Sequence, residues 1–162
     1  MAGETKGVRR SRADAAGLDP IDRRLLGLLS EDAERSYVEL SKLLHLSAPA
    51  VHERVKRLKQ NGVIRATVAL LDGAKIGRSL LAFVHLETSH WETTRRVLDM
   101  SGFPEIEEIH TVAGDTAMIL KVRAANPADL EDLLGRLHQM EGFKAVKTFV
   151  ALGTYLERGP RP

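Results

Sequence analysis

The C-terminal half of the chain contains an internal repeat that restricts the fold more than any other feature of the sequence. Met100-Ser101-Gly102-Phe103 recurs forty residues later as Met140-Glu141-Gly142-Phe143. Each copy lies between a helical pattern and an alternating strand pattern. The expected order is strand 79–88, helix 90–100, strand 105–112, strand 116–123, helix 126–140 and strand 143–152. Two βαβ units in series, joined by a hairpin at Gly114-Asp115, predict an α+β, ferredoxin-like βαββαβ domain.

The N-terminal half predicts three short helices. Their expected starts carry helix-capping residues: Asp19-Pro20, Ser36 with Glu39, and Ser47. Only His45 and Leu46 separate the second helix from the third, which is expected to end near Gln60. Helices joined by so short a turn are typical of a helix-turn-helix, whose second helix enters the major groove of DNA. A plain three-helix bundle is the alternative, but it does not explain the charge asymmetry of the chain. The strand-like stretch at 63–70 is the expected wing.

Basic residues are concentrated in the N-terminal part of the chain. Residues 1–65 carry 13 Lys and Arg against 9 Asp and Glu, whereas residues 66–162 carry 11 against 13. Between Arg54 and Arg65 five residues are basic and none is acidic. Such clustering is typical of a surface that faces nucleic-acid phosphates, although a solvated helix face is an alternative explanation of a charge run.

The first strand of the repeat is apolar on both faces. Its apolar residues alternate as Leu80, Ala82, Val84 and Leu86 on one face and Leu81 and Phe83 on the other. Two helices can cover only one face of the predicted sheet, so the other face is expected to pack on a second chain. The sequence therefore predicts a homo-oligomer.

Several function classes lack the residues that they require. The chain has no cysteine, which excludes thiol catalysis, disulfides and cysteine-ligated metal. No nucleophile elbow, nucleotide-binding glycine motif or paired-histidine zinc motif occurs, so we expect no catalytic residues, no cofactor and no metal. No apolar run is long enough to cross a bilayer and no secretory signal follows the basic N-terminus. These observations favour a cytoplasmic protein without membrane association.

Five segments, by their order and spacing, resemble the Lrp/AsnC family of transcriptional regulators, also called feast/famine regulators. They are Leu18-Asp19-Pro20-Ile21-Asp22, Glu39-Leu40-Ser41, Leu46-Ser47-Ala48-Pro49-Ala50-Val51-His52-Glu53-Arg54-Val55-Lys56-Arg57-Leu58, Asn61-Gly62-Val63-Ile64 and Thr111-Val112-Ala113-Gly114-Asp115. The resemblance covers roughly residues 18–156. It implies a winged helix-turn-helix DNA-binding domain at 18–72 and a ferredoxin-like ligand-sensing and oligomerisation domain at 73–156. A flexible basic arm is expected at 1–17 and a tail at 157–162.

The same resemblance implies dimers that often associate into octamers. It also implies free amino acids or related metabolites as effectors, bound near subunit contacts of the second domain. Two positions depart from the family pattern. His45 stands in the turn where a small residue, often Gly, is usual, and Ala117 stands where a second acidic residue is usual. An amino acid needs partners for both its charged groups, so Ala117 leaves a different ligand, or none, as alternatives.

The residues expected to contact double-stranded DNA lie on the third helix. Its exposed N-terminal part offers candidates for base contacts: Ser47, Ala48, Pro49, His52 and Glu53. Its basic residues are candidates for phosphate contacts: Arg54, Lys56, Arg57 and Lys59. Ser47 has the alternative role of a helix cap alone. Arg54 has the alternative of an ion pair, either near Glu53 or with the first helix. Effector contacts are expected at Thr111, Gly114, Asp115, Thr116 and Thr148.

Two other functions remain as alternatives. Sirohaem decarboxylases share a similar two-domain plan, but they would need His and Arg residues around a tetrapyrrole and would not need a basic third helix. A ligand-binding or scaffolding module that does not bind DNA is the other alternative. Colour or sirohaem binding in the purified protein would favour the first, and absence of DNA affinity at low salt would favour the second.

Overall fold

A computed structural model of the chain describes residues 17–89 and 102–162. The chain divides into two compact units, Met1–Ala69 together with Glu157–Pro162, and Leu70–Leu156. We call them the helical unit and the sheet unit and describe each by itself. The domain limits expected from the sequence, 18–72 and 73–156, remain predictions.

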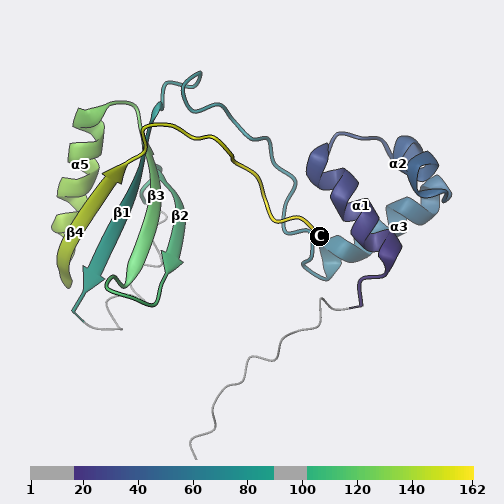
Figure 1. The fold of residues 1–162 in the computed structure, drawn as a ribbon, viewed down its shortest axis with the longest axis horizontal. Helices are drawn as coiled ribbons and strands as arrows, with labels where there is room; N and C mark the ends of the chain where they lie inside the picture. Colours follow the sequence, from purple (N-terminus) through teal and green to yellow (C-terminus); the bar gives the residue numbers. More distant parts are fainter. Residues whose placement is uncertain (1–16, 90–101) are drawn as a thin grey trace, which may run out of the picture. The chain divides into compact units, whose positions relative to one another are not determined.

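The helical unit contains the three expected helices, α1 (Pro20–Glu31), α2 (Tyr37–Leu44) and α3 (Ala48–Gln60) (Figure 1). Capping boxes start the first two. The Asp19 carboxylate accepts a hydrogen bond from the Asp22 amide at 2.7 Å, and Ser36 exchanges bonds with Glu39 in the same way. These side chains bond to amide groups that have no partner inside the helix, which is why the helices begin where the sequence predicts.

One apolar face of each helix forms the core of the helical unit. The buried residues are Leu25, Leu40, Leu44, Val51, Val55 and Leu58. The turn between α2 and α3 is closed by His45, whose backbone is left-handed with φ 55°. The short turn and the shared core hold α3 against α1 and α2, so that only the opposite face of α3 is available to a partner.

Residues 63–70 differ from the expectation of a wing strand. The chain there forms no strand, and Val68 and Leu70 are largely exposed. A strand requires a neighbouring chain with which to exchange backbone hydrogen bonds. The described residues of the helical unit offer none, because they fold into helices and loops.

The sheet unit contains β1 (Leu80–Thr88), β2 (Ile106–Thr111), β3 (Met118–Ala124) and β4 (Phe143–Val150), with α5 (Pro127–His138). The strands are antiparallel in the order β2-β3-β1-β4, as expected for a ferredoxin-like fold, and α5 lies along one face of the sheet (Figure 1). The helix predicted at 90–100 lies outside the described residues.

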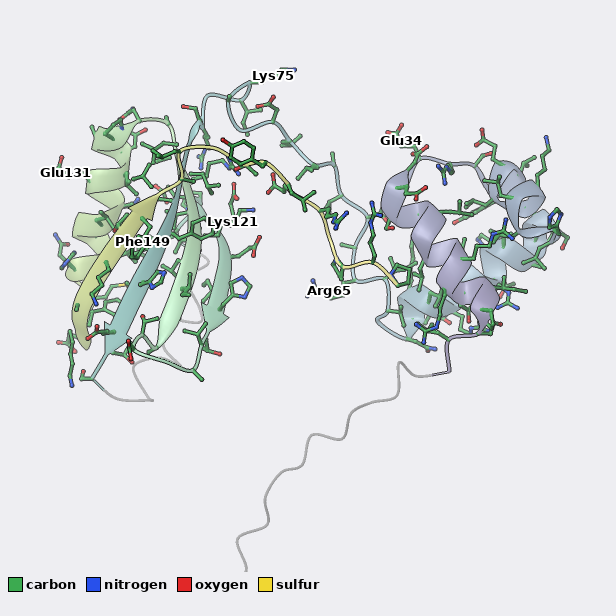
Figure 2. All side chains as sticks on the ribbon, in the orientation of Figure 1. Glu34, Arg65, Lys75, Lys121, Glu131 and Phe149 are labelled. Atoms are coloured by element: carbon green, nitrogen blue, oxygen red, sulfur yellow. The ribbon has the colours of Figure 1, made fainter. Side chains whose placement is uncertain are left out.

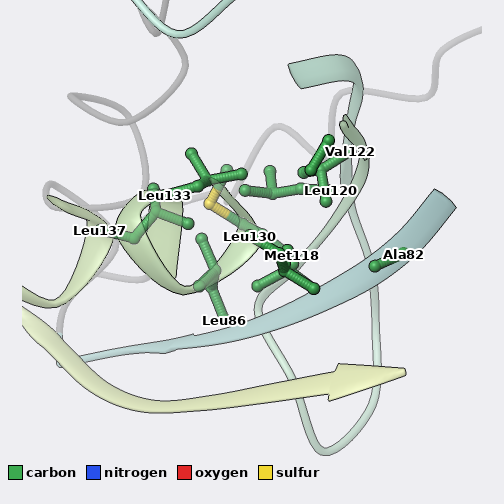
Figure 3. Packing of buried hydrophobic residues seen from close by; sticks show 10 residues of the cluster. Ala82, Leu86, Met118, Leu120, Val122, Leu130, Leu133 and Leu137 are labelled. Atoms are coloured by element: carbon green, nitrogen blue, oxygen red, sulfur yellow. The ribbon is translucent and has the colours of Figure 1, made fainter. Parts of the chain in front are cut away.

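The core of the sheet unit lies between the sheet and α5 (Figure 3). It is built from alternate residues of β1 and β3 and from the apolar stripe of α5: Ala82, Val84, Leu86, Met118, Leu120, Val122, Leu130, Leu133 and Leu137. Cross-strand pairing of Val84 with Leu120 and of Leu86 with Met118 places these side chains on one face. We call it the inner face, and the opposite one the outer face.

The outer face carries apolar side chains that the described residues leave partly open to solvent. Phe83 pairs with Phe149 across β1 and β4, and these side chains are 38% and 54% exposed. Figure 2 shows Phe149 and Lys121 over the strands. No described helix covers this face, and its packing on a second chain remains a prediction.

Candidate DNA-binding surface and effector cavity

The outward side of α3 is polar and exposed, as predicted. Pro49, His52, Glu53, Lys56 and Lys59 are exposed, whereas Val51, Val55 and Leu58 are buried on the opposite side. Ala48 is partly buried in the first turn. The Ser47 hydroxyl accepts a hydrogen bond from the Ala50 amide at 3.3 Å. Ser47 is therefore a helix cap whose side chain is still exposed.

His52 is held in place by two neighbours. Its ring meets the ring of Tyr37 edge-on at 5.3 Å between centroids, and its Nδ1 lies 3.6 Å from the Glu53 carboxylate. The side chain nevertheless remains about half exposed. A ring that is both oriented and accessible is suited to contact base edges.

Arg54 and Arg57 point toward α1 and form an ion cluster with Asp19 and Asp22. Arg54 Nη1 donates to Asp19 Oδ2 at 2.6 Å and to Asp22 Oδ1 at 2.7 Å. Arg57 Nη2 donates to the two carboxylate oxygens of Asp22 at 2.9 and 2.8 Å. The structure thus places Arg54 in the ion pair that the sequence offered as an alternative. Phosphate contact by Arg54 and Arg57 remains a prediction.

The ion cluster shifts the pKa values of Asp19 and Arg54. The pKa of Asp19 is lowered, first by the hydrogen bond from the Asp22 amide and then by the Arg54 guanidinium. The hydrogen bonds to Asp19 and Asp22 raise the pKa of Arg54. Both effects favour the charged forms of Asp19 and Arg54.

Asp22 is the functional residue that the sequence analysis missed. Its side chain is buried, with 1% exposure, although it is an acidic residue. A signal was available, because Asp22 stands four residues after Leu18 and three before Leu25, on the stripe that faces the core. An acidic residue at such a position requires a cationic partner from a neighbouring helix.

Lys56 and Lys59 differ from the two arginines. Neither forms an ion pair with any carboxylate of residues 17–89 or 102–162. Both ammonium groups belong to exposed residues of α3, next to the predicted base-contacting positions. They are the cations of α3 best placed for a phosphate backbone.

A cavity of about 310 Å³ lies on the outer face of the sheet, beside the β2–β3 hairpin. Its lining combines two acidic groups, a cation and two rings with smaller residues: Glu87, Asp115, Lys147, His85, Phe149, Thr116 and Ala145. The His85 and Phe149 rings are 4.9 Å apart, and Lys147 Nζ lies 4.0 Å from Glu87 Oε1. A volume of this size suits a small metabolite.

The cavity includes only part of the predicted effector set. Asp115 and Thr116 line it, whereas Thr111 and Gly114 are outside the lining. Thr148 pairs with the core residue Val84, so strand alternation directs it to the inner face. Ala117 packs against the core. Sequence reasoning missed His85, Glu87, Lys147 and Phe149 because cross-strand pairing brings them together from distant parts of the chain.

Residues 17–89 and 102–162 contain neither a cluster of metal ligands nor a membrane-spanning helix. No group of three or more His, Asp or Glu residues there is arranged to hold a metal ion. None of the helices found there combines the length and apolar character that crossing a membrane requires.

A helix-turn-helix with an exposed basic second helix, followed by a ferredoxin-like unit with a small polar cavity, defines a class of two-domain DNA-binding regulators. The chain belongs to the Lrp/AsnC family within this class. The family model of the AsnC-type helix-turn-helix domain matches residues 18–59, and that of the Lrp/AsnC ligand binding domain matches residues 81–161.

Curated relatives include the HTH-type transcriptional regulator FL11 of Pyrococcus horikoshii, which is 29% identical over 90% of this chain and 96% of its own. The DNA-binding transcriptional activator DecR of Escherichia coli is 34% identical over 74% of this chain and 81% of its own. Both alignments extend from the helical unit into the sheet unit, because each covers more of the chain than either unit contains.

Solved structures have the same fold. An AsnC family transcriptional regulator from Agrobacterium tumefaciens has a TM-score of 0.82 and is 28% identical, covering 89% of this chain and 96% of its own. The feast or famine regulatory protein of M. tuberculosis, solved in complex with L-methionine, has a TM-score of 0.80 and is 31% identical. That alignment covers 90% of this chain and 99% of the other.

Proposed function

We propose that this protein is a sequence-specific DNA-binding transcriptional regulator that inserts α3 into the major groove. The observation that carries the proposal is the division of α3 into a buried apolar side and an exposed side with His52, Lys56 and Lys59. In such helices, residues near the N-terminus contact base edges and basic residues contact phosphates. Because its partner is the genome, we place the protein in the cytoplasm.

Base and phosphate contacts are distinguished by substitution. Lys56→Ala should weaken binding to every duplex similarly and reduce the slope of log affinity against log salt by about 0.9, since it removes one phosphate contact. His52→Ala should instead change the order of preference among sequences. Selection from a random duplex pool, followed by titration at several salt concentrations, measures both effects. Equal loss on all duplexes for His52→Ala would contradict its role in sequence recognition.

We further propose that the outer-face cavity binds an amino acid or a related metabolite at a subunit contact. Lys147 would pair with the ligand carboxylate, Asp115 or Glu87 with its ammonium, and Phe149 would contact its side chain. A small zwitterion needs these opposite charges in one site. In this proposal Asp115 or Glu87 supplies the acidic partner, so no acidic residue is needed at position 117, where Ala117 packs against the core. The L-methionine complex of the M. tuberculosis relative supports this ligand class.

The effector proposal has a matched control on the same strand. Lys147→Ala should lower the affinity for the bound amino acid at least about tenfold, because a charge-assisted hydrogen bond is lost. Lys144 is exposed on β4 outside the cavity lining, so Lys144→Ala should leave the affinity unchanged. Calorimetric titration with a panel of amino acids measures both. Equal effects of the two substitutions, or no heat with any amino acid, would contradict the proposal.

We also propose a homodimer formed through the outer face, with further association to an octamer as the family resemblance implies. Regulation, and not catalysis, is the activity proposed, because the family is one of transcriptional regulators. A tetrapyrrole absorption band in the purified protein would contradict this proposal and favour a sirohaem-decarboxylase-like enzyme.

A further inference from the structure

Asp22 accepts more hydrogen bonds than any other described carboxylate between α1 and α3. Its Oδ1 accepts from Arg54 and Arg57, and its Oδ2 accepts from Arg57 and, at 3.3 Å, from the Asp19 amide. With 1% exposure it has no access to water that could replace these donors. A carboxylate in this environment is strongly destabilised when its cationic partners leave.

The two arginines are therefore held by charges of the protein itself. Asp19 and Asp22 together balance the charges of Arg54 and Arg57. Arg57 is half exposed, so solvent reaches its guanidinium from the other side. A DNA phosphate that met the remaining N–H groups of Arg57 would meet a cation whose charge the buried carboxylate of Asp22 already balances.

We infer that Asp22 is a specificity-determining positioning residue, which withholds Arg54 and Arg57 from the phosphate backbone. Two of the four cations of α3 are then unavailable for non-specific binding to DNA phosphates. The remaining affinity depends more on the base-contacting positions at the start of the helix. This inference rests on the proposed binding of DNA.

The test uses the full chain and a 40-base-pair duplex of random sequence. Asp22→Asn keeps the side-chain shape but removes the charge that holds Arg57. It should bind the random duplex about 5- to 10-fold more tightly in ~0.1 M salt, with a salt slope steeper by about 0.9 for each released arginine that meets a phosphate. The double variant Asp22→Asn/Arg57→Ala should lose most of this gain.

Two comparisons distinguish the proposed role of Asp22 from an effect of misfolding and from an effect of the change in net charge. In the otherwise unchanged protein, Arg57→Ala should leave the slope of log affinity against log salt unchanged, whereas Lys56→Ala should lower it by about 0.9. This comparison does not need Asp22→Asn, so it tests the inference even if that variant does not fold. Glu31→Gln removes the same charge from the other end of α1, where Glu31 pairs with Arg35, and should change affinity for random DNA less than Asp22→Asn.

The outcomes are distinct. Unchanged or weaker random-duplex binding by folded Asp22→Asn, an equal gain in Glu31→Gln, or a lower salt slope in Arg57→Ala would overturn the role of Asp22. If the unaltered protein binds no duplex even at low salt, the proposed function itself fails. Circular dichroism establishes which variants are folded.

Discussion

At the scale of single residues, the turn of the helix-turn-helix depends on an unusual backbone conformation. His45 has φ 55°, and it is the only described non-glycine residue with positive φ. The left-handed conformation brings the Cβ atom close to the backbone, a contact that glycine avoids. The family's usual small residue at this position therefore has a structural reason, and His45 has a conformational cost.

Replacing His45 by glycine should stabilise the helical unit. We expect a gain of about 0.5–1 kcal/mol in the free energy of unfolding, because relief of the left-handed strain exceeds the added flexibility of the unfolded chain. His45→Ala is the control, since alanine keeps the Cβ atom. Urea unfolding followed by circular dichroism measures both variants. A loss of stability in His45→Gly would show that the imidazole makes a contact worth more than the strain.

At the scale of elements, α1 and α2 begin at capping boxes that contain the carboxylates of Asp19 and Glu39, and this makes the stability of the two helices depend on pH. The pKa of Glu39 is lowered from its ordinary 4.5 by hydrogen bonds from the Ser36 amide and hydroxyl, and that of Asp19 is lowered from 3.8. A lowered folded-state pKa means that the stabilisation is complete above the ordinary pKa and is lost as pH falls through the folded value.

The midpoint of thermal unfolding should therefore fall when the pH is lowered from 7 to 3. Glu39→Gln can still cap α2 but cannot titrate, so its midpoint should change less over this range than that of the unaltered protein. Glu34→Gln, in the exposed loop before α2, is the control. Identical pH dependence in Glu39→Gln and Glu34→Gln would contradict the role of the cap.

At the scale of the whole molecule, the outer face of the sheet exposes apolar side chains that a stable monomer would be expected to bury. Phe83 and Phe149 lie there, and Leu152 and Tyr155 after β4 are fully exposed. Apolar side chains gathered in this way mark a surface that another chain covers. A second copy is the partner expected for a two-domain regulator, because symmetric dimers read paired half-sites on DNA.

Phe149→Glu should convert the proposed dimer into a monomer. The substitution places a charge on the outer face, and a carboxylate buried there without a partner costs several kcal/mol. Gln139→Glu adds the same charge at the exposed end of α5 and should leave the dimer intact. Size-exclusion chromatography with light scattering gives the mass of each. A dimeric Phe149→Glu would place the subunit contact elsewhere.

Most of the fold could be predicted from the sequence because its signals are local. Helix caps, apolar periodicity and the repeated Met-x-Gly-Phe segment depend on residues a few positions apart, and hydrogen bonds within each segment follow from them. The exposed side of α3 was predictable for the same reason, since it is the side of the helix opposite the apolar stripe.

The tertiary structure decided what distant residues do to one another. The sequence shows four cations on α3, but only the packing of α1 against α3 pairs two of them with Asp19 and Asp22. Cross-strand pairing likewise placed Lys147 opposite His85, beside Asp115 of the β2–β3 hairpin, in one cavity and directed Thr148 away from it. The physical reason is that charge interactions and cavities depend on distance in space, which a local pattern of residues does not contain.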